Sequence, residues 1–151
     1  MKDCREWLID VDEKIKRVNN VFPLGSVSEI NMFVYNTTSD YHSSPIGDSA
    51  RNILNSKTLP PWFLGNTNSM GFHIVHRNGC DSNIPVGFID ETLVHEYCHA
   101  CTHSEFPFTL DSDFDKWYVE SIAVYLSGRI SNNVYREDCP SYRELSSGMK
   151  Y

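Results

Sequence analysis

The sequence of 151 residues predicts an α+β fold in a single domain, residues 1–151. Two short runs rich in β-branched and aromatic residues have the character of strands. Two long segments in the C-terminal half have the apolar content and length of helices. The expected order is helix, strand, short helix, strand and two long helices, which is an α+β pattern.

The N-terminal segment has the spacing of an amphipathic helix, expected from Lys2 to Asn20. Its apolar face consists of Trp7, Leu8, Val11, Ile15 and Val18. Residues 22–26 (FPLGS) break this helix. Residues 29–35 (EINMFVY) are rich in β-formers and predict the first strand, and the polar residues 36–44 predict a loop.

The middle of the chain predicts a short helix that begins at residue 45 or 47 and ends at Asn55. Residues 66–69 (NTNS) have the composition of a turn. Residues 70–77 (MGFHIVHR) predict the second strand.

Two long helices are expected in the C-terminal half. The first runs from about Pro85, which suits a first helical turn, to His103. The second runs from about Asp113 to Ser127 and is followed by Gly128, a favourable residue after a helix end. Apolar side chains make this second helix largely buried: Trp117, Ile122, Val124, Tyr125 and Leu126.

The first of these two helices contains the sequence H-E-x-x-H at residues 95–99. Residues four apart lie on one face of a helix, so His95 and His99 can hold one metal ion between them. Glu96 can reach a water molecule on the open side of that metal. A zinc-activated water beside a carboxylate base is a hydrolytic nucleophile at neutral pH. The motif therefore indicates zinc, a general base and a hydrolytic reaction.

A catalytic zinc ion usually has three protein ligands, and the sequence offers several candidates for the third. Eight residues of helix rise about 12 Å, so His103 cannot share one ion with His95. The extended motif H-E-x-x-H-x-x-G-x-x-H is not matched, because Thr102 replaces the glycine and Glu105 replaces the last histidine. Cys98 and Cys101 lie beside the histidines and leave a Cys/His structural site as another interpretation.

Glu120 is the remaining candidate for the third ligand. It is the one acid in the otherwise apolar run from Trp117 to Leu126. A buried carboxylate without a partner is unfavourable, and coordination to zinc would remove that cost. The alternatives are an ion pair with Arg129 or exposure to solvent.

These two motifs together resemble the gluzincins, the thermolysin-like and aminopeptidase-like zinc metallopeptidases. The resemblance covers residues 93–127, where H-E-x-x-H is followed by W-x-x-E-S-x-A-x-Y. It implies that His95, His99 and Glu120 bind one zinc ion and that Glu96 is the general base. Ser121 departs from the glycine often found after the ligand glutamate, and no acid stands at position 124 to support a ligand histidine.

The resemblance implies a zincin-like fold, with a small antiparallel or mixed sheet packed on the motif helix and on the helix that bears Glu120. The size of the chain is that of a minimal catalytic core. The strand before the motif helix is expected to border the substrate cleft as an edge strand that can pair with an extended substrate, which by position means Phe72, His73, Ile74 and Val75. Candidate oxyanion or proton donors are Tyr135, Tyr142, His73 and His76.

The expected partner is a peptide or protein substrate, with endopeptidase action slightly preferred. A formal net charge of −7 argues against a nucleic-acid partner, and no apolar run approaches the length of a membrane span. Five cysteines and the absence of a signal peptide predict reduced thiols and a cytoplasmic location. A second hypothesis is a structural or catalytically silent zinc module that acts through protein interaction.

Overall fold

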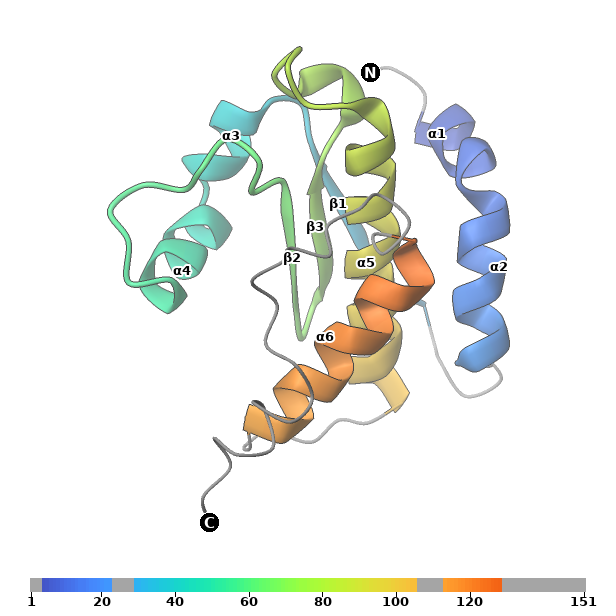
Figure 1. The fold of residues 1–151 in the computed structure, drawn as a ribbon. Coiled ribbons are helices and arrows are strands. Elements are labelled where there is room, and N and C mark those ends of the chain that lie inside the picture. Colours follow the sequence, from blue (N-terminus) through green and yellow to red (C-terminus); the bar gives the residue numbers. More distant parts are fainter. Residues whose placement is uncertain (1–3, 23–28, 106–112, 129–151) are drawn as a thin grey trace, which may run out of the picture.

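The computed structural model describes residues 4–22, 29–105 and 113–128, and these form an α+β fold, as predicted (Figure 1). Six α-helices, a short 3-10 turn and a three-stranded mixed sheet make up this part of the chain. In chain order the elements are α1 (Cys4–Asp10), α2 (Asp12–Val21), β1 (Met32–Tyr35), α3 (Thr38–His42), α4 (Pro45–Ile53), β2 (Gly65–Asn68), β3 (Gly71–Val75), η1 (Arg77–Gly79), α5 (Val86–Glu105) and α6 (Asp113–Ser127).

The sheet has the strand order β1-β3-β2, so β3 lies in the centre. β1 pairs with β3 in parallel, with Val34 opposite Ile74. β2 pairs with β3 antiparallel, with Thr67 opposite Phe72. The prediction that β3 is an edge strand available to a substrate is therefore wrong, because its hydrogen-bonding groups already face two neighbouring strands. Within the described residues, β1 and β2 are the outer strands.

Two elements were predicted as irregular structure and are regular. Residues 66–69 were expected to form a turn, but most of them belong to β2, which pairs with β3 despite having few β-formers. The expected polar loop at 36–44 contains α3, whose first turn is capped by the Thr37 hydroxyl accepting from the Asp40 N–H. Helix α4 begins at Pro45 as expected, with the Ser44 hydroxyl as its cap.

Helix α5 occupies the centre of the fold and contacts α6, α2, β2 and β3 (Figure 1). Its apolar side chains Ile89, Leu93, Val94 and Cys98 are almost completely buried. They belong to one hydrophobic core together with side chains of α1, α2, α6 and the sheet. A helix that is apolar on several faces in this way is expected where neighbours cover it on several sides.

The N-terminal segment is two helices rather than the single helix predicted from Lys2 to Asn20. The chain turns at Val11, which separates α1 from α2 and is itself buried. Polar contacts then attach both helices to α5 along its length. The Trp7 indole donates to Asp90 (2.6 Å), Lys14 lies 3.9 Å from Glu91, and the Tyr97 hydroxyl donates to Asn19 (2.7 Å).

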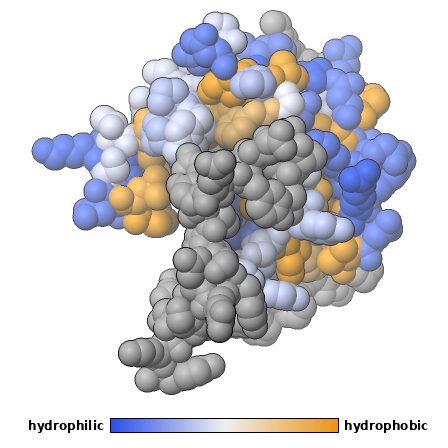
Figure 2. All heavy atoms as spheres, viewed as in Figure 1, coloured by the Kyte–Doolittle hydropathy of each residue, from blue (hydrophilic) through white to orange (hydrophobic). Residues whose placement is uncertain are grey.

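The surface of the described residues mixes hydrophilic and apolar side chains (Figure 2). The large exposed apolar residues are distributed over several elements, for example Ile9 on α1, Ile53 on α4 and Tyr125 on α6. None of the helices in residues 4–22, 29–105 and 113–128 is both long enough and apolar enough to cross a membrane.

The turn that leads into α5 requires glycine at position 79. A Cβ atom there would lie 1.7 Å from the carbonyl oxygen of Asn36, which is part of the backbone and cannot move aside cheaply. We expect Gly79→Ala to lower the free energy of unfolding by about 2 kcal/mol or more, as overpacked sites do. Urea unfolding followed by circular dichroism measures this change.

Gly87 provides the matched control, since a Cβ atom there meets nothing within 4 Å. Gly87→Ala should change the unfolding free energy by less than about 1 kcal/mol, and in the stabilising direction, because it lies in a helix. Equal stability of the two variants would contradict the steric explanation.

Candidate metal centre

Helix α5 brings His95 and His99 together on one face. Their Nε2 atoms are 3.0 Å apart, and only 7% and 11% of the two side chains is exposed. This follows from the four-residue spacing, because such residues are neighbours on a helix surface. Two imidazole nitrogens thus converge in a nearly buried position.

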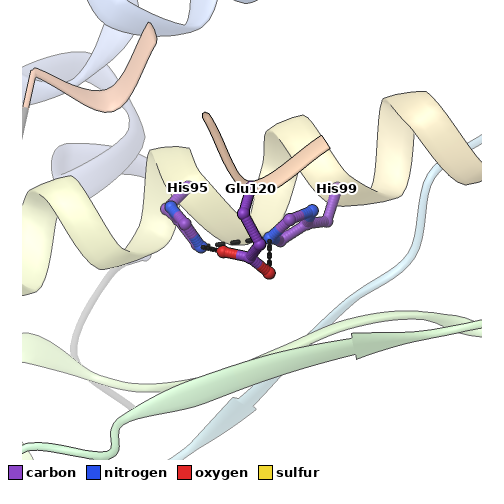
Figure 3. Close-up of side chains that lie close together, drawn as sticks. All are labelled: His95, His99 and Glu120. Atoms are coloured by element: carbon purple, nitrogen blue, oxygen red, sulfur yellow. Dashed lines mark hydrogen bonds and ion pairs between the residues drawn. The ribbon is translucent and has the colours of Figure 1, made fainter. Parts of the chain in front are cut away.

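Glu120 of α6 completes the group. Its Oε2 lies 3.3 Å from Nε2 of His95 and its Oε1 lies 3.1 Å from Nε2 of His99. In Figure 3 the carboxylate lies between the two rings and both contacts are drawn. Val119 and Ala123 on the same helix are buried, whereas 59% of the Glu120 side chain is exposed. The group is therefore buried on the α5 side and open to solvent on the α6 side.

The three side chains could hold one metal ion, since one ligand atom from each lies within 4.8 Å of the others. In a tetrahedral site with bonds of about 2.0–2.1 Å, neighbouring ligand atoms are about 3.3 Å apart. The two Nε2 atoms are 3.0 Å apart, and each lies 3.1–3.3 Å from one of the two carboxylate oxygens of Glu120. Two imidazole nitrogens and one carboxylate oxygen are also a donor set that zinc accepts in catalytic sites. Within the described residues, no other group of three histidine, cysteine or acidic side chains could hold a metal.

The electrostatics of the group favour a charged carboxylate. Hydrogen bonds from His95 and His99 hold the pKa of Glu120 well below its usual range. The opposite ring nitrogen of His95, Nδ1, is buried and has no hydrogen-bond partner among the described residues. Ligand histidines usually donate this N–H to a carboxylate or carbonyl group. The supporting group that the sequence left unassigned therefore remains unassigned in the described part of the chain.

Glu96 directly follows His95 on α5 and does not belong to this group. Its side chain is buried, and its Oε2 lies 2.8 Å from the hydroxyl of Thr67 on β2. The same hydroxyl lies 2.9 Å from the carbonyl oxygen of Glu96. Thr67 could not be identified from the sequence, because residues 66–69 have the composition of a turn and no sequence signal indicates that β2 packs against α5.

The two cysteines of α5 do not join the metal group. Cys98 and Cys101 are fully buried in the hydrophobic core. Burial raises the pKa of the Cys98 thiol to about 12, which opposes the thiolate form that binds zinc. His103 is exposed on the last turn of α5 and is also outside the group. The Cys/His interpretation therefore has no support in the described residues.

The structure places the other predicted site residues elsewhere. His73 lies on the sheet face away from α5, stacked on Phe33 and within 3.2 Å of the Tyr35 hydroxyl. His76 lies edge-on against Trp7 and accepts a hydrogen bond from the Asn78 N–H. Neither histidine belongs to the metal group, so the prediction that they donate to an oxyanion is not supported. The remaining two candidates, Tyr135 and Tyr142, lie outside the described residues.

Comparison of the chain with models of protein families, with curated proteins and with solved structures found no match. The chemistry of the site is therefore inferred from its own residues. Two histidines and a glutamate that converge on one point can bind a metal, and the buried glutamate that follows His95 can exchange a proton.

We expect Glu120→Ala to weaken zinc binding about 100-fold or more, since loss of supporting groups alone costs 10- to 100-fold in other zinc sites. Competition with a chromophoric chelator measures the dissociation constant, and elemental analysis measures the stoichiometry, expected to be one ion per chain. Cys98→Ala and Cys101→Ala are the controls and should bind zinc like the unchanged protein. Stronger weakening by either cysteine variant than by Glu120→Ala would contradict the assignment.

Proposed function

We propose that this protein is a zinc-dependent metallopeptidase of the gluzincin type with a zincin-like fold. The observation that carries this proposal is the convergence of His95, His99 and Glu120 from two packed helices, together with the buried Glu96 that follows His95 on α5. This is the arrangement that the resemblance of residues 93–127 implies. His95, His99 and Glu120 hold the zinc ion, and Glu96 acts as the general base.

The reaction is hydrolysis of a peptide bond. Zinc, when bound, supplies Lewis-acid activation of a water molecule and of the substrate carbonyl group. Glu96 accepts a proton from the attacking water and delivers it to the nitrogen of the leaving amine. The carbon–nitrogen bond breaks, the water oxygen remains in the new carboxyl group, and Glu96 returns to its ionised form.

The openness of the site supports catalysis over a structural role. Structural zinc sites have four protein ligands, whereas catalytic sites have three and keep one position for water or substrate. Among the residues that the structure describes, three protein ligand atoms converge here, and the side chain of Glu120 is 59% exposed. A substrate carbonyl group can therefore approach from the α6 side.

Strand β2 replaces β3 as the strand proposed to border the substrate. An extended peptide can add to a sheet only at an edge strand. Among the described strands β2 pairs only with β3, and its Thr67 contacts Glu96. The backbone of β2 is thus both at the edge of the sheet and next to the proposed base.

A second candidate is a structural zinc module that acts by binding another protein. One observation favours this second candidate: Nδ1 of His95 has no hydrogen-bond partner among the described residues. In catalytic sites an acceptor at this nitrogen raises the basicity of the ligand histidine and orients its ring. The two candidates differ in one measurable property, which is whether Glu96 is needed for a chemical reaction.

We expect Glu96→Gln to bind one zinc ion like the unchanged protein and to lose peptide hydrolysis by about 10²- to 10⁴-fold, the usual contribution of a general base. Cleavage of a mixed peptide library, read by mass spectrometry, measures the activity. Glu91→Gln is the matched control, because Glu91 is a buried glutamate of the same helix that faces Lys14 instead of the metal group. If the unchanged protein binds zinc but cleaves no peptide, the structural candidate replaces the enzyme.

A further inference from the structure

We propose that Thr67 is a positioning residue for the general base, and that its hydroxyl fixes the direction in which the Glu96 carboxylate points. This inference rests on the proposed function, since it assigns to Glu96 the role of base. It adds a residue outside both motifs and on a different element, β2.

The hydroxyl contacts the two ends of the same residue. Thr67 Oγ1 lies 2.8 Å from Oε2 of Glu96 and 2.9 Å from the Glu96 carbonyl oxygen. The hydroxyl has one proton, which it shares between these two acceptors or donates to one of them. A glutamate side chain has three rotatable bonds, and a rotation that moves Oε2 away from the hydroxyl breaks this contact. The contact therefore favours one orientation of the carboxylate relative to the backbone of α5.

Strand β2 gives the hydroxyl a fixed place. Thr67 pairs with Phe72 in the centre of β2, and as a β-branched residue it has a restricted side-chain torsion. On the opposite face of the strand, Asn66 accepts a hydrogen bond from the buried Tyr41 (3.0 Å). The strand is thus anchored from both faces at the position where it meets Glu96.

Gly65 provides the room that this contact requires. Residues two apart in a strand point to the same face, so Gly65 and Thr67 both face α5. A Cβ atom at Gly65 would lie 2.8 Å from the His73 carbonyl oxygen, 3.0 Å from Cδ1 of Ile74 and 3.1 Å from Cγ of Glu96, each closer than ordinary contact. The strand therefore leaves space for the Glu96 side chain at one position and holds its carboxylate at the next position on that face.

A hydroxyl group suits this task. It carries one proton and two lone pairs, so it can donate to a carboxylate and can accept from a carboxylic acid. Serine keeps these properties, whereas valine keeps the shape of threonine and loses them. The pair Thr67→Ser and Thr67→Val therefore separates the hydroxyl from the packing of the side chain.

The test compares these variants in the zinc-loaded protein. We expect Thr67→Val to lower kcat about 10- to 100-fold with little change in KM, and Thr67→Ser to stay within about threefold of the unchanged protein, because only valine removes the hydrogen bond. Thr67→Ala should show the same loss as Thr67→Val. In a Glu96→Gln background, Thr67→Val should cause no further loss, because the group that it positions is absent.

A second readout does not depend on activity. NMR of protein labelled with ¹³C at glutamate Cδ, with the Glu96 resonance assigned from Glu96→Gln, reports the surroundings of this carboxylate. We expect one distinct Glu96 resonance in the unchanged protein and in Thr67→Ser, and a shift toward the average glutamate position in Thr67→Val. Thr102→Val is the matched control, because the Thr102 hydroxyl donates to a carbonyl of α5, that of Cys98, without reaching Glu96.

The outcomes separate the two proposals. An unchanged kcat and an unchanged Glu96 resonance in Thr67→Val overturn the role of Thr67. Equal losses in Thr67→Val and Thr102→Val, or loss of zinc from Thr67→Val, also overturn it, because they show a structural role. If the unchanged protein cleaves no peptide, the proposed function fails, while the resonance still decides whether Thr67 fixes Glu96.

Discussion

The structure depends on the burial of a helix that carries polar groups. Helix α5 lies among the sheet, α2 and α6, and its apolar side chains, such as Leu93 and Val94, fill the core. This packing fixes the rotation of the helix and forces His95, Glu96 and His99 into positions with little access to water. Buried polar side chains are unfavourable unless they find partners. The neighbours of α5 supply those partners: α6 places Glu120 against the two histidines, and β2 places Thr67 against Glu96.

Helix α6 supplies Glu120 to the metal group and packs through only part of its surface, since Trp117 and Tyr125, which were predicted to be buried, are exposed. Val119, Ala123 and Leu126 are buried, whereas Glu120 alone reaches the two histidines. The side chain of Glu120 is more than half exposed, and its contacts with two imidazole groups further favour the charged carboxylate, as the lowered pKa of Glu120 reflects. The packing of α6 on α5 and the geometry of the metal group are thus determined by the same contact between two helices.

The sequence predicted the parts of the site that depend on local spacing. The helix predicted from Pro85 to His103 agrees with α5, and the apolar surroundings of Glu120 pointed to the third member of the group. The break at Val11, strand β2 and helix α3 were not predicted, because they depend on contacts with distant residues or on single caps. Thr67 could not be found for the same reason: its partner lies 29 residues away and the two meet only after β2 pairs with β3.

Strand β2 shows why this part of the chain has the composition of a turn. Its four residues (GNTN) have low strand propensity, and their own preferences would not form a strand. Each residue nevertheless has a specific role. On the face toward α5, Gly65 leaves room for the Glu96 side chain and Thr67 contacts its carboxylate. On the opposite face, Asn66 contacts Tyr41 and Asn68 contacts His73. Replacing them by valine or isoleucine would raise strand propensity and remove every one of these contacts. Residues that conflict with local propensity while satisfying specific contacts are expected beside functional sites, where the requirements of the site override those of the element.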